Sequence, residues 1–185
     1  MSIQHEKKLF IIPGWMKSVG FYGDCKGLDI WKNNFNLNAQ IDAAYIVGHS
    51  SGANFALINR SLNKNSNSKL ILLNPLLPKK NFLYWIFQWM KFAFKGGIRV
   101  DKTMGIKQFF PALKNFAALL NFDPIKIIET IPKENLIIIR GSEDRFFCDD
   151  NAKKIIKEKN INLVEVDGLG HEWNENFLNA IKDVI

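Results

Sequence analysis

The sequence has few cysteines and few histidines, and both shortages limit its chemistry. Its two cysteines, Cys25 and Cys148, lie far apart and outside any Cys-x-x-Cys or Cys/His metal spacing. Neither a disulfide framework nor a zinc site is indicated, and we expect no cofactor. Such cysteine usage fits a reducing, cytoplasmic setting. Only His5, His49 and His171 could serve as a histidine base.

Long hydrophobic runs are missing as well. The apolar run near Phe82–Met90 is far shorter than the roughly 20 residues of a membrane crossing, so we expect no spanning helix. The first apolar run, Leu9–Ile12, stops at Pro13 without a small-residue cleavage site, unlike a secretory signal. The length of 185 residues suits a single domain over 1–185 with one core.

Acidic residues are outnumbered, with 18 Asp and Glu against 25 Lys and Arg and a formal net charge of +7. This charge would admit nucleic acid, a membrane surface or an acidic substrate as partner. Lysine and asparagine are abundant throughout, however, and no nucleic-acid-binding module is recognisable. We therefore expect no nucleic-acid partner, and the sequence does not indicate an oligomeric state.

Five short apolar runs, each bounded by polar or turn residues, are typical of buried parallel strands. They are Leu9–Ile12, Ala44–Val47, Leu70–Leu73, Leu136–Ile139 and Leu163–Val166. Glu165 interrupts the last run and indicates an edge strand. Helical patterns cover Ala53–Leu62, Asp150–Lys159 and Trp173–Val184. The alternation predicts an α/β, three-layer fold around a mostly parallel sheet of about five to six strands.

Two stretches do not fit simple alternation. Gly14–Asp42 reads as loop with one short helix around Leu28–Phe35, and a further strand could lie within it. Pro75–Pro132 is much longer than one crossover helix requires. We therefore expect a helical, lid-like insertion over about 76–132.

The motif with the clearest chemistry is Gly48-His49-Ser50-Ser51-Gly52, between a predicted strand and a predicted helix. A sharp turn there would lift the Ser50 hydroxyl out of the sheet, and side chains at positions 48 and 52 would collide with neighbouring backbone. The turn would also point a helix N-terminus at the reaction centre, where it can stabilise an oxyanion. The motif therefore predicts a nucleophilic serine.

A nucleophilic serine needs a histidine and a carboxylate to activate it. His5 lies near the start of the chain and His49 points away on the turn, which leaves His171 as the candidate base. Asp144 is the leading carboxylate because it follows the fourth predicted strand, and Glu143 and Asp149 are second choices. The alternative position after the third strand holds Asn74-Pro75 instead of an acid.

The oxyanion needs a second backbone donor, normally from the loop after the strand beside the nucleophile strand. Pro13-Gly14-Trp15-Met16 occupies that loop. The N–H groups of Trp15 and Ser51 are therefore the expected donor pair.

Taken together, these motifs resemble the α/β-hydrolase superfamily, with Ser50, Asp144 and His171 in the family's order of nucleophile, acid and base. Pro-Gly-Trp after the first strand also resembles the His-Gly-Trp of some small carboxylesterases, with Pro13 in place of histidine. The chain has no room before Leu9 for the family's first two strands, and it is most similar to trimmed, single-domain serine hydrolases of bacteria. The resemblance implies hydrolysis of a small-molecule ester or thioester through an acyl-enzyme.

The aromatic segment Phe82–Phe94 is too apolar all round for an ordinary surface helix, so something should cover it. Basic residues surround it, with Asp101 the one acid between Lys79 and Lys102. A lid over the site, a helix docking on anionic lipid or an acidic carrier protein, and a buried helix all remain open.

Three functions are compatible with this sequence. The leading hypothesis is a carboxylesterase-type serine hydrolase. An acyltransferase or thioesterase acting on carrier-bound acyl groups would use the same three residues. A non-catalytic binding protein could keep the scaffold and engage partners through Lys79–Lys102.

Overall fold

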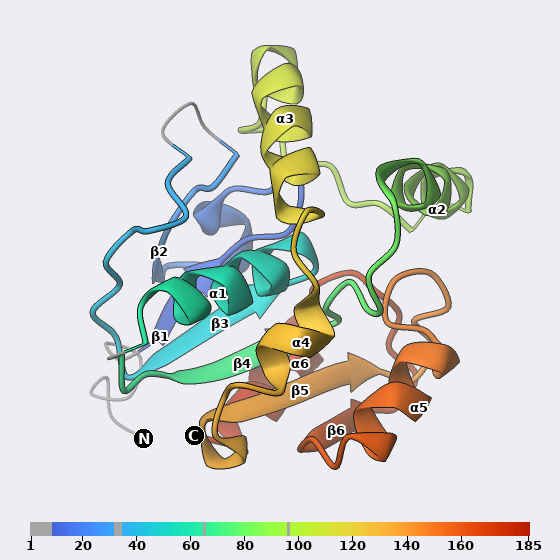
Figure 1. The fold of residues 1–185 in the computed structure, drawn as a ribbon. Coiled ribbons are helices and arrows are strands. Elements are labelled where there is room, and N and C mark those ends of the chain that lie inside the picture. The colour runs from blue at the N-terminus through green and yellow to red at the C-terminus, as the bar shows by residue number, and fades with distance from the viewer. Residues whose placement is uncertain (1–8, 32–34, 65, 96) are drawn as a thin grey trace.

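A computed structural model describes residues 9–31, 35–64, 66–95 and 97–185, in which six parallel strands form one sheet (Figure 1). The strands are β1 (Leu9–Ile12), β2 (Lys26–Gly27), β3 (Tyr45–His49), β4 (Lys69–Leu73), β5 (Leu136–Gly141) and β6 (Leu163–Val166). Their order is β2-β1-β3-β4-β5-β6. All five predicted strands are present, β6 lies at the edge as Glu165 indicated, and β2 lies within the stretch that left room for a strand.

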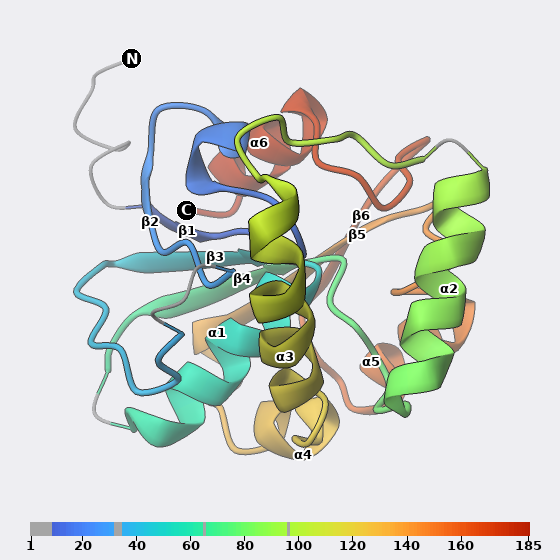
Figure 2. The ribbon, with the colours of Figure 1, turned by 90° about the horizontal axis from the view of Figure 1, so that it is seen from above.

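Helices cover both faces of this sheet, which confirms the predicted three layers (Figures 1 and 2). The α-helices are α1 (Ser51–Leu62), α2 (Phe82–Phe94), α3 (Phe109–Leu119), α4 (Pro124–Ile128), α5 (Asp150–Glu158) and α6 (Glu175–Lys182), and short 3-10 helices cover Val19–Tyr22, Ile106–Gln108 and Lys133–Asn135. In Figure 2, α6 lies on the opposite side of the sheet from α1 and α4.

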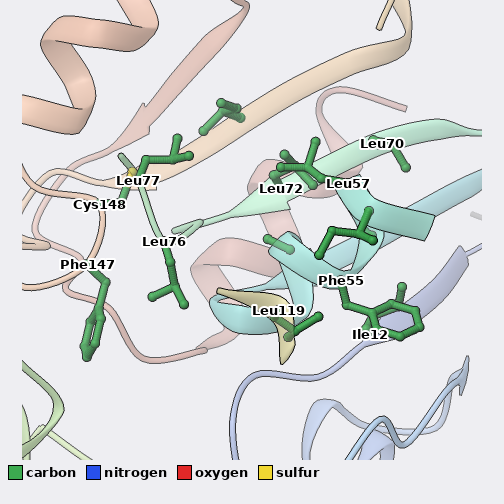
Figure 3. Packing of buried hydrophobic residues seen from close by; sticks show 14 of the residues in the cluster. Ile12, Phe55, Leu57, Leu70, Leu72, Leu76, Leu77, Leu119, Phe147 and Cys148 are labelled. Carbon is green, nitrogen blue, oxygen red and sulfur yellow. The ribbon is translucent and has the colours of Figure 1, made fainter. Parts of the chain in front are cut away.

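The central strands are apolar on both faces because each face has its own core. Along β4, Leu70 and Leu72 point into a large cluster with α1, α3, α4 and α5, and Figure 3 shows part of it. Ile71 and Leu73 point the other way, into a smaller cluster with α6. The period of two expected of a strand thus divides one apolar run between two cores.

The short helix expected around Leu28–Phe35 is not formed in its described part. Residues 28–31 are loop and turn, and residues 32–34 lie outside the described residues. Ile30 and Trp31 are buried, and the Trp31 indole donates a 2.6 Å hydrogen bond to the carbonyl of Gly14. The apolar residues at this point anchor a loop to the core, so their pattern did not mark the face of a helix.

The last helix begins two residues later than its apolar pattern suggested. Asn174 caps α6 by accepting from the N–H groups of Asn176 and Phe177. Trp173 therefore precedes the helix, although it is buried in the same cluster as Phe177 and Ile181.

Residues 76–132 contain α2, α3 and α4, and α2 lies beyond the carboxyl ends of the strands (Figures 1 and 2). Trp85 and Phe92 on one side of α2 are buried against the rest of the chain. The opposite side is exposed and carries Leu83, Phe87, Met90 and Phe94. The described chain therefore covers this aromatic segment on one side and leaves its other side exposed.

No helix in the described ranges combines the length and the apolar character needed to cross a membrane.

Candidate active site

The turn from β3 to α1 holds Ser50 in an unusual backbone conformation, with φ 55° and ψ −125°. A Cβ at Gly48 would lie 2.5 Å from the Cα of Ala53, and one at Gly52 would meet the carbonyls of Ile12 and Pro13. Only glycine fits at either position, as the sequence pattern predicted. The strained turn places Ser50 between the sheet and the N-terminus of α1.

Ser50, His171 and Asp144 form one hydrogen-bonded line. The Oγ of Ser50 lies 2.8 Å from Nε2 of His171, and Nδ1 of His171 lies 2.7 Å from Oδ2 of Asp144. All three side chains are buried. Because an ionised Asp144 can only accept, Nδ1 carries the proton and Nε2 accepts from the Ser50 hydroxyl. This arrangement can take the proton from Ser50 and stabilise the imidazolium that results.

Asp144 is kept ionised by its surroundings. Burial alone raises the pKa of a carboxyl group, but His171 and the backbone N–H groups of Phe146 and Phe147 outweigh it, and the pKa of Asp144 is lowered. Those two N–H groups donate to Oδ1 at 3.1 Å, and the N–H of Cys148 donates to Oδ2 at 3.1 Å. The loop after β5 therefore holds the carboxylate in its charged form beside the imidazole.

The two second-choice acids lie elsewhere. Glu143 is exposed. Asp149 caps α5, accepting from the N–H of Ala152 at 2.9 Å. Neither replaces Asp144 beside His171.

Tyr22 and His49, whose contacts the sequence did not predict, link the two loops that flank Ser50. The N–H of Gly14 donates to the Tyr22 hydroxyl at 2.9 Å, and that hydroxyl lies 2.7 Å from Nδ1 of His49. Nε2 of His49 lies 2.9 Å from the carbonyl of His171. Since that carbonyl can only accept, His49 donates through Nε2 and accepts from Tyr22 through Nδ1. His5, the third histidine, lies outside the described residues.

In the sequence, Asn74 stood out only because it occupies a position where an acid could have been. In the structure it holds the loop that carries His171. Its amide nitrogen donates to the carbonyls of Gly170 and His171 at 3.0 and 3.1 Å, and its amide oxygen accepts from the N–H of Gly141 at 2.9 Å. It therefore fastens the loop that carries His171 to the end of β5. A polar residue directly after an apolar run was the signal available in the sequence.

Arg140 supports the acid loop from inside β5. It is buried and forms 2.8 Å ion pairs with Asp150 and with Glu165, its neighbour in β6. It also donates to the carbonyl of Asp144 at 3.3 Å. An arginine directly after an apolar run was the sequence signal for this contact.

A cavity of about 460 Å³ opens beside Ser50 and His171. Trp15 and Ser51, the expected oxyanion donors, are among the residues that line it. Its apolar wall includes Trp89, Phe92, Met104, Phe109 and Phe116. The Trp15 and Trp89 rings meet edge to face with centroids 4.9 Å apart, so α2 contacts the loop after β1 across this wall.

In the described part of the chain, no group of three or more His, Cys, Asp or Glu side chains is arranged to hold a metal ion. The histidines that do meet, His49 and His171, already have hydrogen-bond partners at both ring nitrogens.

No protein-family model matches the sequence. No curated protein matches it either.

Solved structures do resemble it. E-2-(acetamidomethylene)succinate hydrolase aligns with a TM-score of 0.66 and 15% identity over 95% of this chain and 90% of its own. An α/β-hydrolase enzyme from a Medee basin deep-sea metagenome library aligns with a TM-score of 0.60 and 16% identity, over 95% of this chain and 88% of its own. The Paleococcus ferrophilus monoacylglycerol lipase aligns with a TM-score of 0.51 and 13% identity, over 95% and 92%.

These alignments cover nearly the whole chain, and at such low sequence identity they show a shared fold and nothing more. They agree with the six-stranded parallel sheet and the helices on both of its faces. The chain therefore has the α/β-hydrolase fold.

Proposed function

We propose that this protein is a serine hydrolase that cleaves a carboxylic ester through an acyl-enzyme. The observation that carries the proposal is the line of 2.8 and 2.7 Å contacts from Ser50 through His171 to Asp144, which opens onto a largely apolar cavity. Hydrolases among the solved structures with the same fold add support.

Acylation begins when the Ser50 oxygen attacks the ester carbonyl carbon while Nε2 of His171 takes its proton. Asp144 stabilises the imidazolium through Nδ1. The N–H groups of Trp15 and Ser51 stabilise the negative oxygen of the tetrahedral intermediate, helped by the positive end of α1. Collapse breaks the bond to the alcohol, which leaves with the proton from His171.

Deacylation repeats these steps with water. His171 takes a proton from a water molecule while the water oxygen attacks the acyl carbon, and Ser50 recovers that proton when the acid departs.

In this proposal residues 76–132 act as a helical lid, since Trp89 and Phe92 of α2 border the cavity. The apolar wall suits the hydrocarbon part of a small ester.

A fluorophosphonate probe tests the proposal directly. The wild-type protein should be labelled, and labelling should disappear in Ser50→Ala but persist in Ser61→Ala, a serine near the end of α1 that serves as the control. Labelling that survives Ser50→Ala, or no labelling of folded wild-type protein, would rule the assignment out.

A second experiment compares hydrolysis of an ester with hydrolysis of the matching acyl thioester, with and without an acceptor alcohol. It separates esterase, thioesterase and transferase activity.

A further inference from the structure

One acid of the insertion is buried at the wall of the cavity. Asp101, the one acid in a basic stretch of the sequence, is 7% exposed and lies in residues 97–104, between α2 and α3 (Figure 2). We call residues 97–104 the strap. The strap residues that line the cavity are Ile98, Arg99, Val100, Asp101 and Met104. A carboxylate buried in such a wall needs partners that compensate for the water it has lost.

Four hydrogen bonds hold the Asp101 carboxylate. Its Oδ2 accepts from the N–H and from the hydroxyl of Ser18, each at 2.6 Å. Its Oδ1 accepts from the N–H and the hydroxyl of Thr103, at 2.8 and 2.7 Å. Burial raises the pKa of Asp101, but the hydrogen bonds from Ser18 and Thr103 outweigh it and lower the pKa to about 2. The charged carboxylate therefore joins the strap to the loop after β1.

The loop after β1 turns sharply just before Ser18. The N–H of Lys17 donates to the carbonyl of Gly14 at 3.1 Å, which closes a four-residue turn with Trp15 and Met16 at its centre. Met16 has φ 57°, in the left-handed region that turns of this kind normally fill with glycine or asparagine. Such a strained conformation persists where the surrounding structure fixes it.

Each end of this turn is fixed by a different side chain. At its first end, the N–H of Gly14 donates to the Tyr22 hydroxyl at 2.9 Å. Beyond its other end, Ser18 is held by two hydrogen bonds to Asp101. The N–H of Trp15, the expected oxyanion donor, lies between these two fixed points, so its direction depends on both.

The other charged residues at this wall form longer contacts. Lys17 and Glu172 are ion-pair partners at 3.4 Å, and the N–H of Arg99 donates to the other oxygen of Glu172 at 3.4 Å. The Arg99 guanidinium donates to the carbonyl of Trp173, also at 3.4 Å. These contacts connect the turn and the strap to the loop after β6. Because short hydrogen bonds to a charged group are the stronger kind, Asp101 is the main support of the turn on this side.

We propose that Asp101 is a positioning residue for the oxyanion hole, acting through Ser18 on the turn that presents the N–H of Trp15. The inference rests on the proposed ester hydrolysis at Ser50, in which that N–H stabilises the negative oxygen of the tetrahedral intermediate. Without the carboxylate the strained turn relaxes and the N–H leaves its position, while the cavity is kept. The loss therefore falls on the transition state and spares binding of the uncharged ester.

Asp101→Asn tests this role, because an amide of the same size has one acceptor oxygen in place of two. The probe is propyl trifluoromethyl ketone: the Ser50 oxygen adds to its carbonyl carbon, the Ser50 proton passes to His171, and the resulting negative oxygen enters the oxyanion hole. The alcohol made by reducing this ketone has nearly the same shape and cannot form the adduct.

Three quantities are measured: kcat/KM for p-nitrophenyl butyrate and the inhibition constants Ki of the ketone and of the alcohol. Complete removal of an oxyanion donor costs roughly a hundredfold to a thousandfold in kcat. For Asp101→Asn, in which the donor is displaced, we expect kcat/KM to fall about tenfold or more and the ketone Ki to rise by a similar factor. The alcohol Ki should change less than about twofold.

Two further variants separate positioning from folding. Asp123→Asn changes an aspartate of residues 76–132 that caps α4 outside the cavity, and it should keep all three wild-type values. Ser18→Ala removes the hydroxyl bond to Asp101 and keeps the backbone one, so it should lower kcat/KM and ketone affinity by about threefold each. If Asp101→Asn does not fold, Ser18→Ala decides the question.

The inference is wrong if folded Asp101→Asn keeps the wild-type kcat/KM and ketone affinity. It is also wrong if the ketone and the alcohol weaken by the same factor, since that indicates general damage to the cavity. A wild-type enzyme that is labelled by fluorophosphonate and hydrolyses the ester, but whose variants fail these expectations, refutes the positioning role alone. Absence of both labelling and hydrolysis in wild-type protein refutes the proposed function and this inference with it.

Discussion

At the scale of single residues, the Tyr22 side chain connects two loops of the candidate active site through hydrogen bonds. Its hydroxyl accepts from the N–H of Gly14, in the loop after β1, and donates to Nδ1 of His49. His49 in turn donates to the backbone carbonyl of His171, in the loop after β6. Both loops line the cavity beside Ser50. Their relative position therefore depends on hydrogen bonds that touch neither the nucleophile nor the substrate.

Tyr22→Phe removes the hydroxyl and leaves the ring in place. We expect kcat to fall about tenfold with little change in KM, because orientation is lost while the cavity is kept. The free energy of unfolding should fall by about 1–3 kcal/mol, since a buried N–H and a ring nitrogen lose their partner. Steady-state kinetics and urea unfolding measure both quantities.

The matched control for this prediction is Tyr45→Phe, at the start of β3 and away from Ser50. It should leave kcat unchanged. If Tyr22→Phe lowers stability but keeps wild-type kcat well below the melting temperature, its role is structural and the positioning role is wrong.

The candidate site was predictable from sequence where a local pattern marks it. Ser50 stands in a glycine-flanked turn between strand and helix, and Asp144 and His171 each follow an apolar run. No local sequence pattern predicted the contacts of Tyr22 and Lys17. Tyr22 acts through residues far along the chain, and Lys17 resembles any other lysine until the fold buries it.

At the scale of elements, α2 presents an apolar face that the described chain does not cover. Leu83, Phe87, Met90 and Phe94 recur at the spacing of one helical face, and Phe94 is 85% exposed. Lysines adjoin this face, with Lys80 near the Tyr84 ring and Lys91 4.5 Å from the centre of the Phe87 ring. We propose that this face docks on an anionic lipid surface, since apolar and cationic groups lie together there.

Vesicle sedimentation checks this docking. The protein should bind phosphatidylglycerol-containing vesicles and bind pure phosphatidylcholine vesicles more weakly, and added salt should weaken binding by screening the lysines. The double variant Phe87→Ser/Phe94→Ser should reduce binding tenfold or more. Leu62→Ser, an exposed apolar residue at the end of α1, serves as control. Equal binding by both serine-substituted proteins, or binding to an acidic carrier protein but not to vesicles, would contradict the proposal.

The elements themselves were predictable to different degrees. Four of the five predicted strands were evident because burial leaves a continuous apolar run, whereas β6 is half-buried at the edge and its run is interrupted by Glu165. β2 spans two residues, too short for any periodicity, and it forms because β1 offers it an open edge. The expected helix around Leu28–Phe35 was wrong in its described part, because apolar residues that anchor a loop have the same composition as a helix face.

At the scale of the whole molecule, burial of His49 links folding to pH. Burial, reinforced by nearby His171, lowers the pKa of His49 to about 3, whereas an unfolded histidine has a pKa of about 6.5. Between these values the unfolded chain binds a proton that the folded chain does not. The free energy of unfolding should therefore fall as the pH drops from about 6.5 toward 3.

Urea unfolding at pH 7, 6 and 5 tests this linkage. In wild-type protein His49 should contribute a slope approaching about 1.4 kcal/mol per pH unit below pH 6. His49→Gln keeps a donor and an acceptor but cannot titrate, so its slope should be smaller by about 1 kcal/mol per pH unit. Identical slopes in the two proteins would show that His49 takes up a proton in the folded state.

Asp144 adds to the same behaviour at lower pH. Its folded pKa is lowered, so its stabilising contribution is present above the unfolded value of about 3.9 and is lost as the pH falls through the folded value. The free energy of unfolding should therefore fall over two pH ranges, between about 6.5 and 3 through His49 and below about 3.9 through Asp144.

The edge-to-face contact of Trp15 with Trp89 gives the molecule an optical reporter of its own. Two indoles with centroids 4.9 Å apart should couple their electronic transitions and give a circular dichroism band of two opposite signs, an exciton couplet, that a single indole lacks. One ring belongs to the loop after β1 and the other to α2. Any separation of α2 from that loop should abolish the signal, so opening of the cavity could be followed in solution without attaching a dye.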